Sequence, residues 1–402
     1  MKKVYLDYAA TTPLDKIVAK AMKPFFIKNF GNPGSLHSFG RIAEIAVDRA
    51  REETANFFNV DSDGVFFTSG ATEANNWIIY SACSVNKSQN KKDIPHIITT
   101  SIEHKSILEP IKYLEKQGII DVTYIKPNKK GIINPKDVEN SLRENTTLIS
   151  IGYVNNEIGA IQPLKEIGII IKNFSNNLIS YKLQAEKLIF HSDATQAINY
   201  LDCDFNKLGV DAISISAHKI YGPKGIGALI IKKNISLKPL FYGGGQEQGM
   251  RSGTLNVPGI IGLAKAINQL QTTNYKLQIK KIQNLQSKLK KGIMKIYPKV
   301  KIISSLEKTV PNNLSVIFTK IESQIMLIAF DQEGIAVSTG SACQAKGVEP
   351  SHVLLSLSYS HQEAMSFIRF SLGKYTTNMD IEYTLEKLEK IIQKLILKKT
   401  LA

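Results

Sequence analysis

The sequence predicts an α/β protein, with a mainly parallel sheet in a large domain and a smaller α/β domain at the C-terminal end. Short apolar runs typical of buried strands alternate with segments whose apolar residues recur at helical spacing. Several of these runs end in polar side chains, as expected where parallel strands border a ligand site. The 402 residues, 43% hydrophobic and 21% charged, are typical of a globular protein and sufficient for two domains.

The composition also argues against several classes of protein. No apolar run reaches the roughly 18 residues that a membrane-spanning helix needs. The N-terminal residues include Asp7, where a secretion signal would require an apolar segment. Three scattered cysteines are too few for a disulfide framework and favour a reducing compartment. We therefore expect a cytoplasmic protein without a membrane anchor.

The formal net charge of +16 has two interpretations. It could provide an electrostatic surface for RNA or for an acidic protein partner. It could also reflect a general abundance of lysine, which is spread over segments such as 274–301 and 387–399. No basic stripe interleaved with aromatic residues is present. The composition favours the second interpretation, and we do not expect a nucleic acid partner.

The first elements are assigned from the spacing of their apolar residues and from the Gly and Pro residues that interrupt regular structure. Residues 4–13 form an extended entry that is closed by a proline, and residues 15–30 have a helical pattern. A loop rich in Gly, Pro, Asn and Ser covers 31–40, and a second helical pattern covers 41–58.

A strand, a tight turn and a helix follow one another at residues 65–77. The β-rich run gives way at Ser69 and Gly70 to a helical pattern that includes Thr72. The free N–H groups at such a helix start favour an anion, typically a phosphate. The alternative is a Ser/Thr cap without any ligand.

Further strands are predicted at 95–101, 147–154, 188–196 and 211–216, and each ends near polar residues. Taken singly, each of these residues has an ordinary structural explanation, such as capping a turn. Strands of a parallel sheet end at the same edge, so the side chains should converge there. The residues expected at this edge are Thr72, His104, Asn155, Asp193 and Lys219.

Lys219 follows a buried strand and precedes a glycine-rich turn. Burial and neighbouring cations lower the pKa of a lysine, which would make this one a candidate Schiff-base nucleophile. A solvated loop lysine is the alternative in so lysine-rich a chain.

The C-terminal half continues with a strand at 228–231, a glycine-dense loop at 242–254 and a long helix at 257–297. Later strands are expected at 313–318 and 335–338, and a helix at 381–398 closes the chain. We assign residues 15–260 to the large domain. Residues 1–14 and 261–402 form the small domain.

Cys343 is the best candidate for a reactive thiol. It lies in a loop of small residues at 339–347, which leaves it accessible, and Lys346 favours its thiolate form. Cys83 lies near a helix end instead, and Cys203 lies between two acids, which would raise its pKa. Arg369, in an apolar strand, fits either bidentate capture of a carboxylate or a structural ion pair.

A series of short motifs, in this order, resembles the cysteine desulfurases of the NifS/IscS type. These belong to the class V aminotransferase group of fold-type I enzymes, which use pyridoxal 5'-phosphate (PLP). The motifs are Tyr5-Leu-Asp-Tyr-Ala-Ala-Thr-Thr-Pro, Gly31-Asn-Pro, Ser69-Gly-Ala-Thr-Glu, Glu103-His104, Asn155-Asn-Glu-Ile-Gly, Asp193-Ala-Thr-Gln196, Ser216-Ala-His-Lys219-Ile-Tyr-Gly-Pro-Lys-Gly, Arg251-Ser-Gly-Thr254-Leu-Asn and Gly340-Ser-Ala-Cys343. The resemblance covers nearly the whole chain.

The resemblance implies a role for each matching residue. Lys219 would bind PLP covalently, Asp193 would pair with its pyridine nitrogen, and Gln196 would bond its ring hydroxyl. His104 would stack on the ring and help to move protons. The remaining implied ligands are Ala71, Thr72, Ser216, His218 and a partner subunit's Thr254 for the phosphate, and Asn155 and Arg369 for the substrate carboxylate.

The implied function is desulfuration of L-cysteine to L-alanine. Sulfur would pass to Cys343 as a persulfide, on a mobile loop at about 338–350, and then to an acceptor for iron–sulfur cluster assembly or tRNA thiolation. The resemblance implies a homodimer and no resident metal, with a transient contact between Cys343 and an iron–sulfur cluster left open. The alternatives are a selenocysteine lyase or another class V PLP lyase, and a catalytically idle PLP-fold protein that binds RNA or protein.

Overall fold

A seven-stranded sheet forms the centre of the larger domain in the computed structural model, which describes residues 2–83, 94–180, 188–233, 235–304, 308–340 and 349–400. Its strands run in the order β2-β8-β7-β6-β5-β3-β4. Strands β4, β3, β5, β6 and β7 are parallel, and β8 is antiparallel to both of its neighbours. The predicted mainly parallel α/β sheet is therefore confirmed. The strands are β2 (Val65–Thr68), β3 (His96–Thr100), β4 (Asp121–Ile125), β5 (Thr146–Ser150), β6 (Ile189–Asp193), β7 (Ala212–Ser216) and β8 (Gly227–Ile231).

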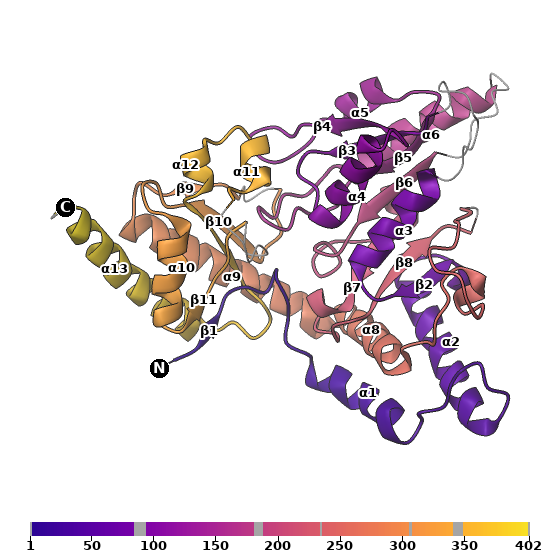
Figure 1. Ribbon diagram of the computed structural model, residues 1–402. Coiled ribbons are helices and arrows are strands. Elements are labelled where there is room, and N and C mark those ends of the chain that lie inside the picture. The colour runs from indigo at the N-terminus through magenta and orange to yellow at the C-terminus, as the bar shows by residue number, and fades with distance from the viewer. Residues whose placement is uncertain are drawn as a thin grey trace.

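Helices cover both faces of this sheet (Figure 1). One face packs on α1, α2, α6 and α8, through side chains such as Val18, Val47 and Ile260. The other face packs on α3 and α4, around the buried Trp77 and Ile107. Because both faces are covered, most strand residues are buried, and these include polar ones such as His191 and Ser214. The helices of this domain are α1 (Lys16–Ile27), α2 (Ser38–Phe58), α3 (Ala71–Cys83), α4 (Lys105–Lys116), α5 (Pro135–Ser141), α6 (Leu164–Ser180), α7 (Phe205–Leu208) and α8 (Val257–Leu270).

The smaller domain is built from both ends of the chain (Figure 1). Its antiparallel sheet has the order β12-β10-β9, and β1 pairs in parallel with β11. Leu6 from the N-terminal end packs in one core with Leu289, Phe330 and Phe370. The elements are β1 (Val4–Tyr5), α9 (Thr273–Ile296), β9 (Lys301–Ile302), β10 (Asn313–Ile317), α10 (Ser323–Gln332), β11 (Ile335–Ala336), α11 (His352–Ser356), α12 (His361–Ala364), β12 (Phe367–Ser371) and α13 (Asn378–Thr400).

The single long helix predicted at 257–297 is wrong, because the chain breaks it into α8 and α9. The break lies at Thr272, which is the N-cap of α9. Its side chain accepts a hydrogen bond from the N–H of Tyr275 at 3.3 Å, and a new helix therefore begins there. The domain boundary proposed at residue 260 falls inside α8, whose buried side chains belong to the larger core. Helix α9 begins on that core at Tyr275 and continues in the smaller core from Ile282.

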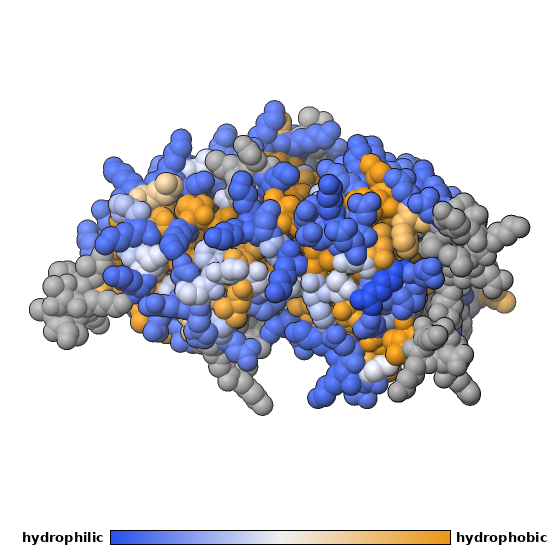
Figure 2. Space-filling model, turned by 90° about the horizontal axis from the view of Figure 1, so that it is seen from above, coloured by the Kyte–Doolittle hydropathy of each residue, from blue (hydrophilic) through white to orange (hydrophobic). Residues whose placement is uncertain are grey.

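The face of the molecule seen from above is mostly hydrophilic, with hydrophobic side chains in small separate areas (Figure 2). Throughout the described ranges, no helix combines the length and the apolar character needed to cross a membrane.

Two buried histidines join neighbouring strands of the large sheet. The ring of His191 on β6 lies 2.9 Å from the hydroxyls of both Ser150 and Ser214, on the two adjacent strands. His96 on β3 is held in the same way, at 2.9 Å from the hydroxyls of Thr146 and Thr123. Burial lowers the pKa of each histidine to about 4. Both rings are therefore neutral in the folded protein near neutral pH.

This arrangement predicts a loss of stability in mild acid. The folded-state pKa of His191 lies below the ordinary value of 6.5, so between these values only the unfolded chain takes up a proton. The free energy of unfolding should fall as pH drops through this window, by about 2 kcal/mol for His191 at about pH 5. Urea denaturation of the wild type and His191→Gln at about pH 7.5 and about pH 5 measures this contribution. An equal loss in both proteins would contradict it.

Candidate active site

A cavity of about 580 Å³ opens where the strands of the large sheet end, and the small domain forms part of its wall. Ten of the residues predicted for the site line this one cavity: Ala71, Thr72, His104, Asn155, Asp193, Gln196, Ser216, His218, Lys219 and Arg369. Thr254 is exposed and does not line it. Cys343 lies outside the described residues. Among the residues that the structure describes, no cluster of His, Cys, Asp and Glu side chains could hold a metal ion.

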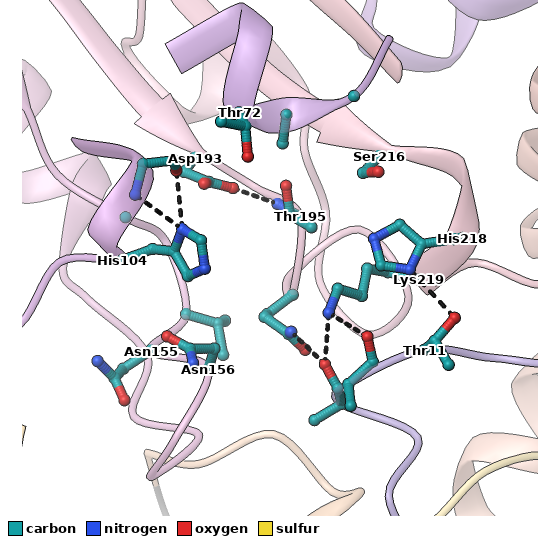
Figure 3. Close-up of a pocket in the computed structure, with 18 of the residues that line it drawn as sticks. Thr11, Thr72, His104, Asn155, Asn156, Asp193, Thr195, Ser216, His218 and Lys219 are labelled. Carbon is teal, nitrogen blue, oxygen red and sulfur yellow. Dashed lines mark hydrogen bonds between the residues drawn. The ribbon is translucent and has the colours of Figure 1, made fainter. Parts of the chain in front are cut away.

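Lys219 reaches across the cavity to the N-terminal segment (Figure 3). It ends a short 3-10 turn (Ala217–Lys219) directly after β7. Its Nζ donates hydrogen bonds to the carbonyl oxygens of Ala9 at 2.7 Å and Ala10 at 2.6 Å. The amide of Gln196 donates to the same Ala9 oxygen at 2.9 Å. The lysine is therefore held at the site rather than solvated, as the strand-end position suggested.

One end of the cavity is suited to an anion. Helix α3 starts there at Ala71, and its first N–H groups have no carbonyl partner within the helix. Ser216 and His218 lie opposite this helix start (Figure 3). Glycine is needed below it, because a Cβ at Gly227 would lie 2.7 Å from Cα of Gly70. Strand β8 can thus pass directly under the turn that precedes α3.

His218 is a neutral donor or acceptor at this end. Its Nδ1 lies 3.1 Å from the hydroxyl of Thr11. Burial lowers the pKa of His218 to about 4, and the positive charges of Lys219 and Lys224 contribute. The ring can therefore form hydrogen bonds at neutral pH without adding a third positive charge beside the two lysines.

The pairing of Glu73 with Arg251 ties the glycine-dense loop to the start of α3, and the sequence did not reveal it. Glu73 accepts a hydrogen bond from the N–H of Ser69 at 2.8 Å. The same carboxylate receives Nε and Nη2 of Arg251 at 2.7 and 3.1 Å. These bonds hold the pKa of Glu73 below its usual value, although burial opposes them. The loop that carries Thr254 is therefore fixed next to the anion end of the cavity.

Asp193, at the end of β6, presents a carboxylate to the middle of the cavity (Figure 3). Its two oxygens accept hydrogen bonds from the side-chain amide of Asn75 at 2.8 Å and the N–H of Thr195 at 2.9 Å. The hydroxyl of Thr195 is buried and has no protein partner, although this residue lines the cavity. The site thus offers an oriented acid and an unused hydroxyl to a ligand.

His104 caps α4 and directs its ring into the cavity (Figure 3). Nδ1 accepts a hydrogen bond from the N–H of Ser106 at 3.1 Å. The proton of the neutral ring is therefore on Nε2. Surrounding protein atoms lower the pKa of His104; Asp193 acts in the opposite direction, and the charge of Lys219 adds to the lowering. The ring is neutral near pH 7 and can exchange a proton at Nε2.

Asn155 lies on a loop rather than at a strand end. The strand predicted to reach residue 154 stops at Ser150, and the chain then turns so that Val154 pairs with Ile161. The amide of Asn155 donates to the carbonyl of Ile102 at 2.7 Å, and its oxygen accepts from two N–H groups of its own loop. Most of its bonding capacity is used within the protein.

Arg369 forms an ion pair and still has a free N–H group. Nη2 lies 2.7 Å from Asp7, and Nη1 donates to the carbonyl of Asn156 at 2.8 Å. Its Nε is buried and has no protein partner. The structural ion pair that the sequence left open is therefore present, and Nε still lacks a protein partner.

Two buried acids beside the site residues had no role in the sequence interpretation. Glu103 accepts hydrogen bonds from the hydroxyl of Thr100 at 2.6 Å and from the N–H of Gly152. Burial raises the pKa of Glu103 and of Glu157 to about 7, partly offset by their hydrogen bonds. Both belong to motifs quoted above, Glu103-His104 and Asn155-Asn-Glu-Ile-Gly, and this is the signal that could have drawn attention to them.

The two described cysteines are poor nucleophiles. Burial raises the pKa of Cys83 to about 12. Cys203 is 1% exposed, and its pKa is raised by burial first and by the charge of Asp202 second. The effect expected from acids beside Cys203 is therefore present, but burial is the larger cause. Neither thiol lines the cavity.

Comparisons with known proteins cover the chain almost completely. The family model described as aminotransferase class-V matches residues 4–384. The cysteine desulfurase IscS of Dictyoglomus turgidum is 43% identical over 394 residues, which are 98% of this chain and 95% of that protein. A solved NifS-like protein is 37% identical with a TM-score of 0.88, covering 98% of this chain and 100% of its own. Another structure, SspA in complex with cysteine, is 35% identical with a TM-score of 0.78, covering 93% and 100%. The similarity thus includes both domains and every described wall of the cavity.

Proposed function

Because the chain belongs to the class V aminotransferase family and, within it, to the cysteine desulfurases, we propose that it converts L-cysteine to L-alanine and transfers the sulfur to Cys343. Enzymes of this family depend on PLP, and this chain is a PLP-dependent enzyme. One observation carries the proposal: Lys219, Asp193 and His104 come from three separate strand ends and line one cavity. The chain segment that leads to Cys343 forms another part of the same wall, through Ser338, Thr339 and Gly340.

The residues present fit PLP. Its phosphate suits the start of α3, with Thr72, Ser216 and His218 around it. His104 would contact its aromatic ring, and the carboxylate of Asp193 would pair with its pyridine nitrogen. The buried, unpaired hydroxyl of Thr195 gives the ring edge a further polar contact. When bound, PLP supplies an electron sink for the amino acid attached to it.

The chain's own groups then have distinct tasks. Lys219 would hold the cofactor and, when released, accept and return a proton at Nζ. His104 would exchange a proton at Nε2. Arg369, and Asn155 to the extent that its remaining amide hydrogen allows, would orient the substrate carboxylate.

Sulfur transfer belongs to Cys343. Its sulfur forms a bond to the substrate sulfur while the carbon–sulfur bond breaks, and the electron pair stays on the carbon. The carbon takes a proton and becomes the methyl group of alanine, and the enzyme keeps a persulfide. No external oxidant is required, because the carbon is reduced as the sulfur is oxidised.

The direct experiment is to incubate the purified PLP-bound protein with L-cysteine and a thiol reductant. Alanine and sulfide should form in equal amounts. Formation of pyruvate and ammonia instead would indicate another PLP lyase. A strong preference for selenocysteine, without a persulfide on Cys343, would favour the selenocysteine lyase alternative. Salt-sensitive RNA binding without turnover would support the idle PLP-fold alternative.

The sulfur acceptor is proposed to be a protein of iron–sulfur cluster assembly or tRNA thiolation, in line with the IscS name of the relatives. A cytoplasmic location is proposed as well. It is supported by the two described cysteines, which are both free thiols, as in a reducing compartment.

We also propose that the enzyme is a homodimer. Exposed apolar side chains are concentrated on α1, the following loop and the start of α2. These elements lie at the bottom of Figure 1. They include Phe26, Ile27, Phe30, Leu36, Phe39, Ile42 and Ile45, and the rings of Phe30 and Phe39 are 5.8 Å apart. Contiguous exposed apolar surface of this kind marks a protein interface. Thr254, on the nearby loop, is exposed and does not line this chain's own cavity, which agrees with a role in a partner's phosphate site.

Light scattering should therefore give a mass of twice the 44.6 kDa of one chain. Ile27→Asp should shift the protein toward the monomer, because it places a charge in the proposed interface. Ile328→Asp is the matched control, since Ile328 is similarly exposed on α10 in the small domain. A wild-type monomer, or equal dissociation by both variants, would contradict this interface.

A further inference from the structure

The buried carboxyl of Glu157 joins two parts of the small domain that are separated by the sequence around Cys343. The hydroxyl of Ser351, at the start of α11, donates a hydrogen bond to Oε2 of Glu157. On the other side, Gly340 packs against the same oxygen atom. Residues 340 and 351 therefore meet at one carboxyl group, and Cys343 belongs to the stretch of chain between them.

Gly340 is required for this meeting. A Cβ at this position would overlap with Oε2 of Glu157 and would lie 2.6 Å from Cβ of Ser351. The chain can approach the carboxyl this closely only because the residue has no side chain. Any larger residue would separate residue 340 from Glu157 or from Ser351.

Glu157 is itself fixed by contacts from both domains. Its N–H donates to the side-chain oxygen of Asn155 at 3.0 Å. Its carbonyl accepts hydrogen bonds from the amide of Asn313 at 3.0 Å and the hydroxyl of Ser315 at 2.6 Å, both on β10. Glu157 as a whole is 3% exposed, so its carboxyl has little access to water. The carboxyl is a rigid point to which the two chain segments are attached.

We propose that Glu157 is a positioning residue for sulfur transfer: by holding Gly340, in the wall of the cavity, close to Ser351, it fixes the two described residues between which Cys343 lies in the sequence. This inference rests on the proposed desulfurase function. Glu157 does not line the cavity and is not proposed to touch the substrate. Its effect should therefore fall on the step that uses Cys343 and spare the steps that do not.

Two substrates separate these steps. With L-cysteine, the substrate sulfur must form a bond to the Cys343 sulfur as its carbon–sulfur bond breaks. With L-cysteine sulfinate, the sulfur is already oxidised and leaves as sulfur dioxide, while the electron pair stays on the carbon, which takes a proton. Both reactions give alanine, but only the first needs the thiol. The ratio of the two rates therefore reports on the placement of Cys343.

The test measures alanine formation from both substrates by PLP-bound enzyme. Glu157→Ala should lower kcat for L-cysteine about 10- to 100-fold, since misplacement by about 1 Å has effects of this size. Turnover of L-cysteine sulfinate should change less than about twofold, well below an effect of this kind. Glu157→Gln should restore most of the L-cysteine rate, because its amide oxygen can still accept the Ser351 hydrogen bond.

Ser351→Ala should show the same selective loss, and combining it with Glu157→Ala should add little, since both changes break one contact. Ser360→Ala is the matched control. It removes the equivalent cap of the next helix, α12, where Ser360 bonds to Glu363 and not to Glu157. If Glu157→Ala does not fold, the L-cysteine and L-cysteine sulfinate rates of Ser351→Ala and Ser360→Ala test the proposal instead. Only Ser351→Ala should lose the L-cysteine rate selectively.

Equal loss of both activities, or no loss of either, would overturn the role of Glu157 while leaving the desulfurase function intact. A wild-type enzyme that makes no alanine from L-cysteine would instead overturn the proposed function, and the positioning role with it.

Discussion

Replacing Lys219 with alanine is expected to abolish alanine formation from L-cysteine, with a fall of about 10³-fold or more. Lys219 is the lysine that the strand-end geometry places at the cavity, and its Nζ is held by the carbonyls of Ala9 and Ala10. Without its amine, the chain would lose both the proposed covalent attachment of PLP and the proposed base at that position. The rate of alanine formation and the visible absorption of the bound cofactor measure the two losses.

Lys219→Arg tests whether the site needs only a positive charge at this position or an amine that can act as a nucleophile. Arginine keeps the positive charge and can donate to the two carbonyls, but it does not deprotonate in proteins. It should be as inactive as Lys219→Ala. Lys233→Ala, which removes an exposed lysine near the same sheet, should retain the wild-type rate. Full turnover by Lys219→Ala would refute the assignment of the whole site.

Cys343→Ser is expected to stop desulfuration while leaving PLP bound, because a hydroxyl cannot take up the substrate sulfur as a persulfide. The rate with L-cysteine should fall about 10²-fold or more, the range typical when a catalytic group is removed. Mass spectrometry after a single addition of L-cysteine should find one added sulfur atom on the wild type and none on the variant. The visible spectrum of the variant should still change when L-cysteine binds.

Cys83→Ser is the control for this prediction. Cys83 does not line the cavity, and burial raises the pKa of its thiol to about 12, so it carries almost no thiolate at neutral pH. Its replacement should leave persulfide formation unchanged. If Cys343→Ser released sulfide at the wild-type rate, sulfur transfer would have to use another group, and the persulfide route would be wrong.

The strand-end residues could be predicted from the sequence because they depend on local signals. Asp193 and Lys219 each follow a run typical of a buried strand, and parallel strands place their ends together. Thr72 follows a strand–turn–helix pattern that also needs no distant contact. The family motifs then connected these positions to one cofactor.

Pairings between distant residues could not be predicted in this way. Arg251 and Glu73 are 178 residues apart, and Ser351 and Glu157 are 194 apart. Neither contact has a local signal, because each depends on how the finished domains pack. The break between α8 and α9 was missed for a different reason: their apolar periodicity continues across Thr272, and only the cap shows the change.

The parallel pairing of β1 with β11 affects the order in which the parts of this enzyme can fold during synthesis on the ribosome. Val4 pairs with Ile335, so the first strand has no partner until nearly all of the chain has been synthesised. The segment that follows β1 supplies the carbonyls of Ala9 and Ala10 that hold Lys219. All seven strands of the large sheet are complete by Ile231, and domains generally fold as they emerge. During synthesis, the large sheet should therefore form well before Lys219 acquires its hydrogen bonds to Ala9 and Ala10. The ability to bind PLP stably should appear only when most of the chain has been synthesised.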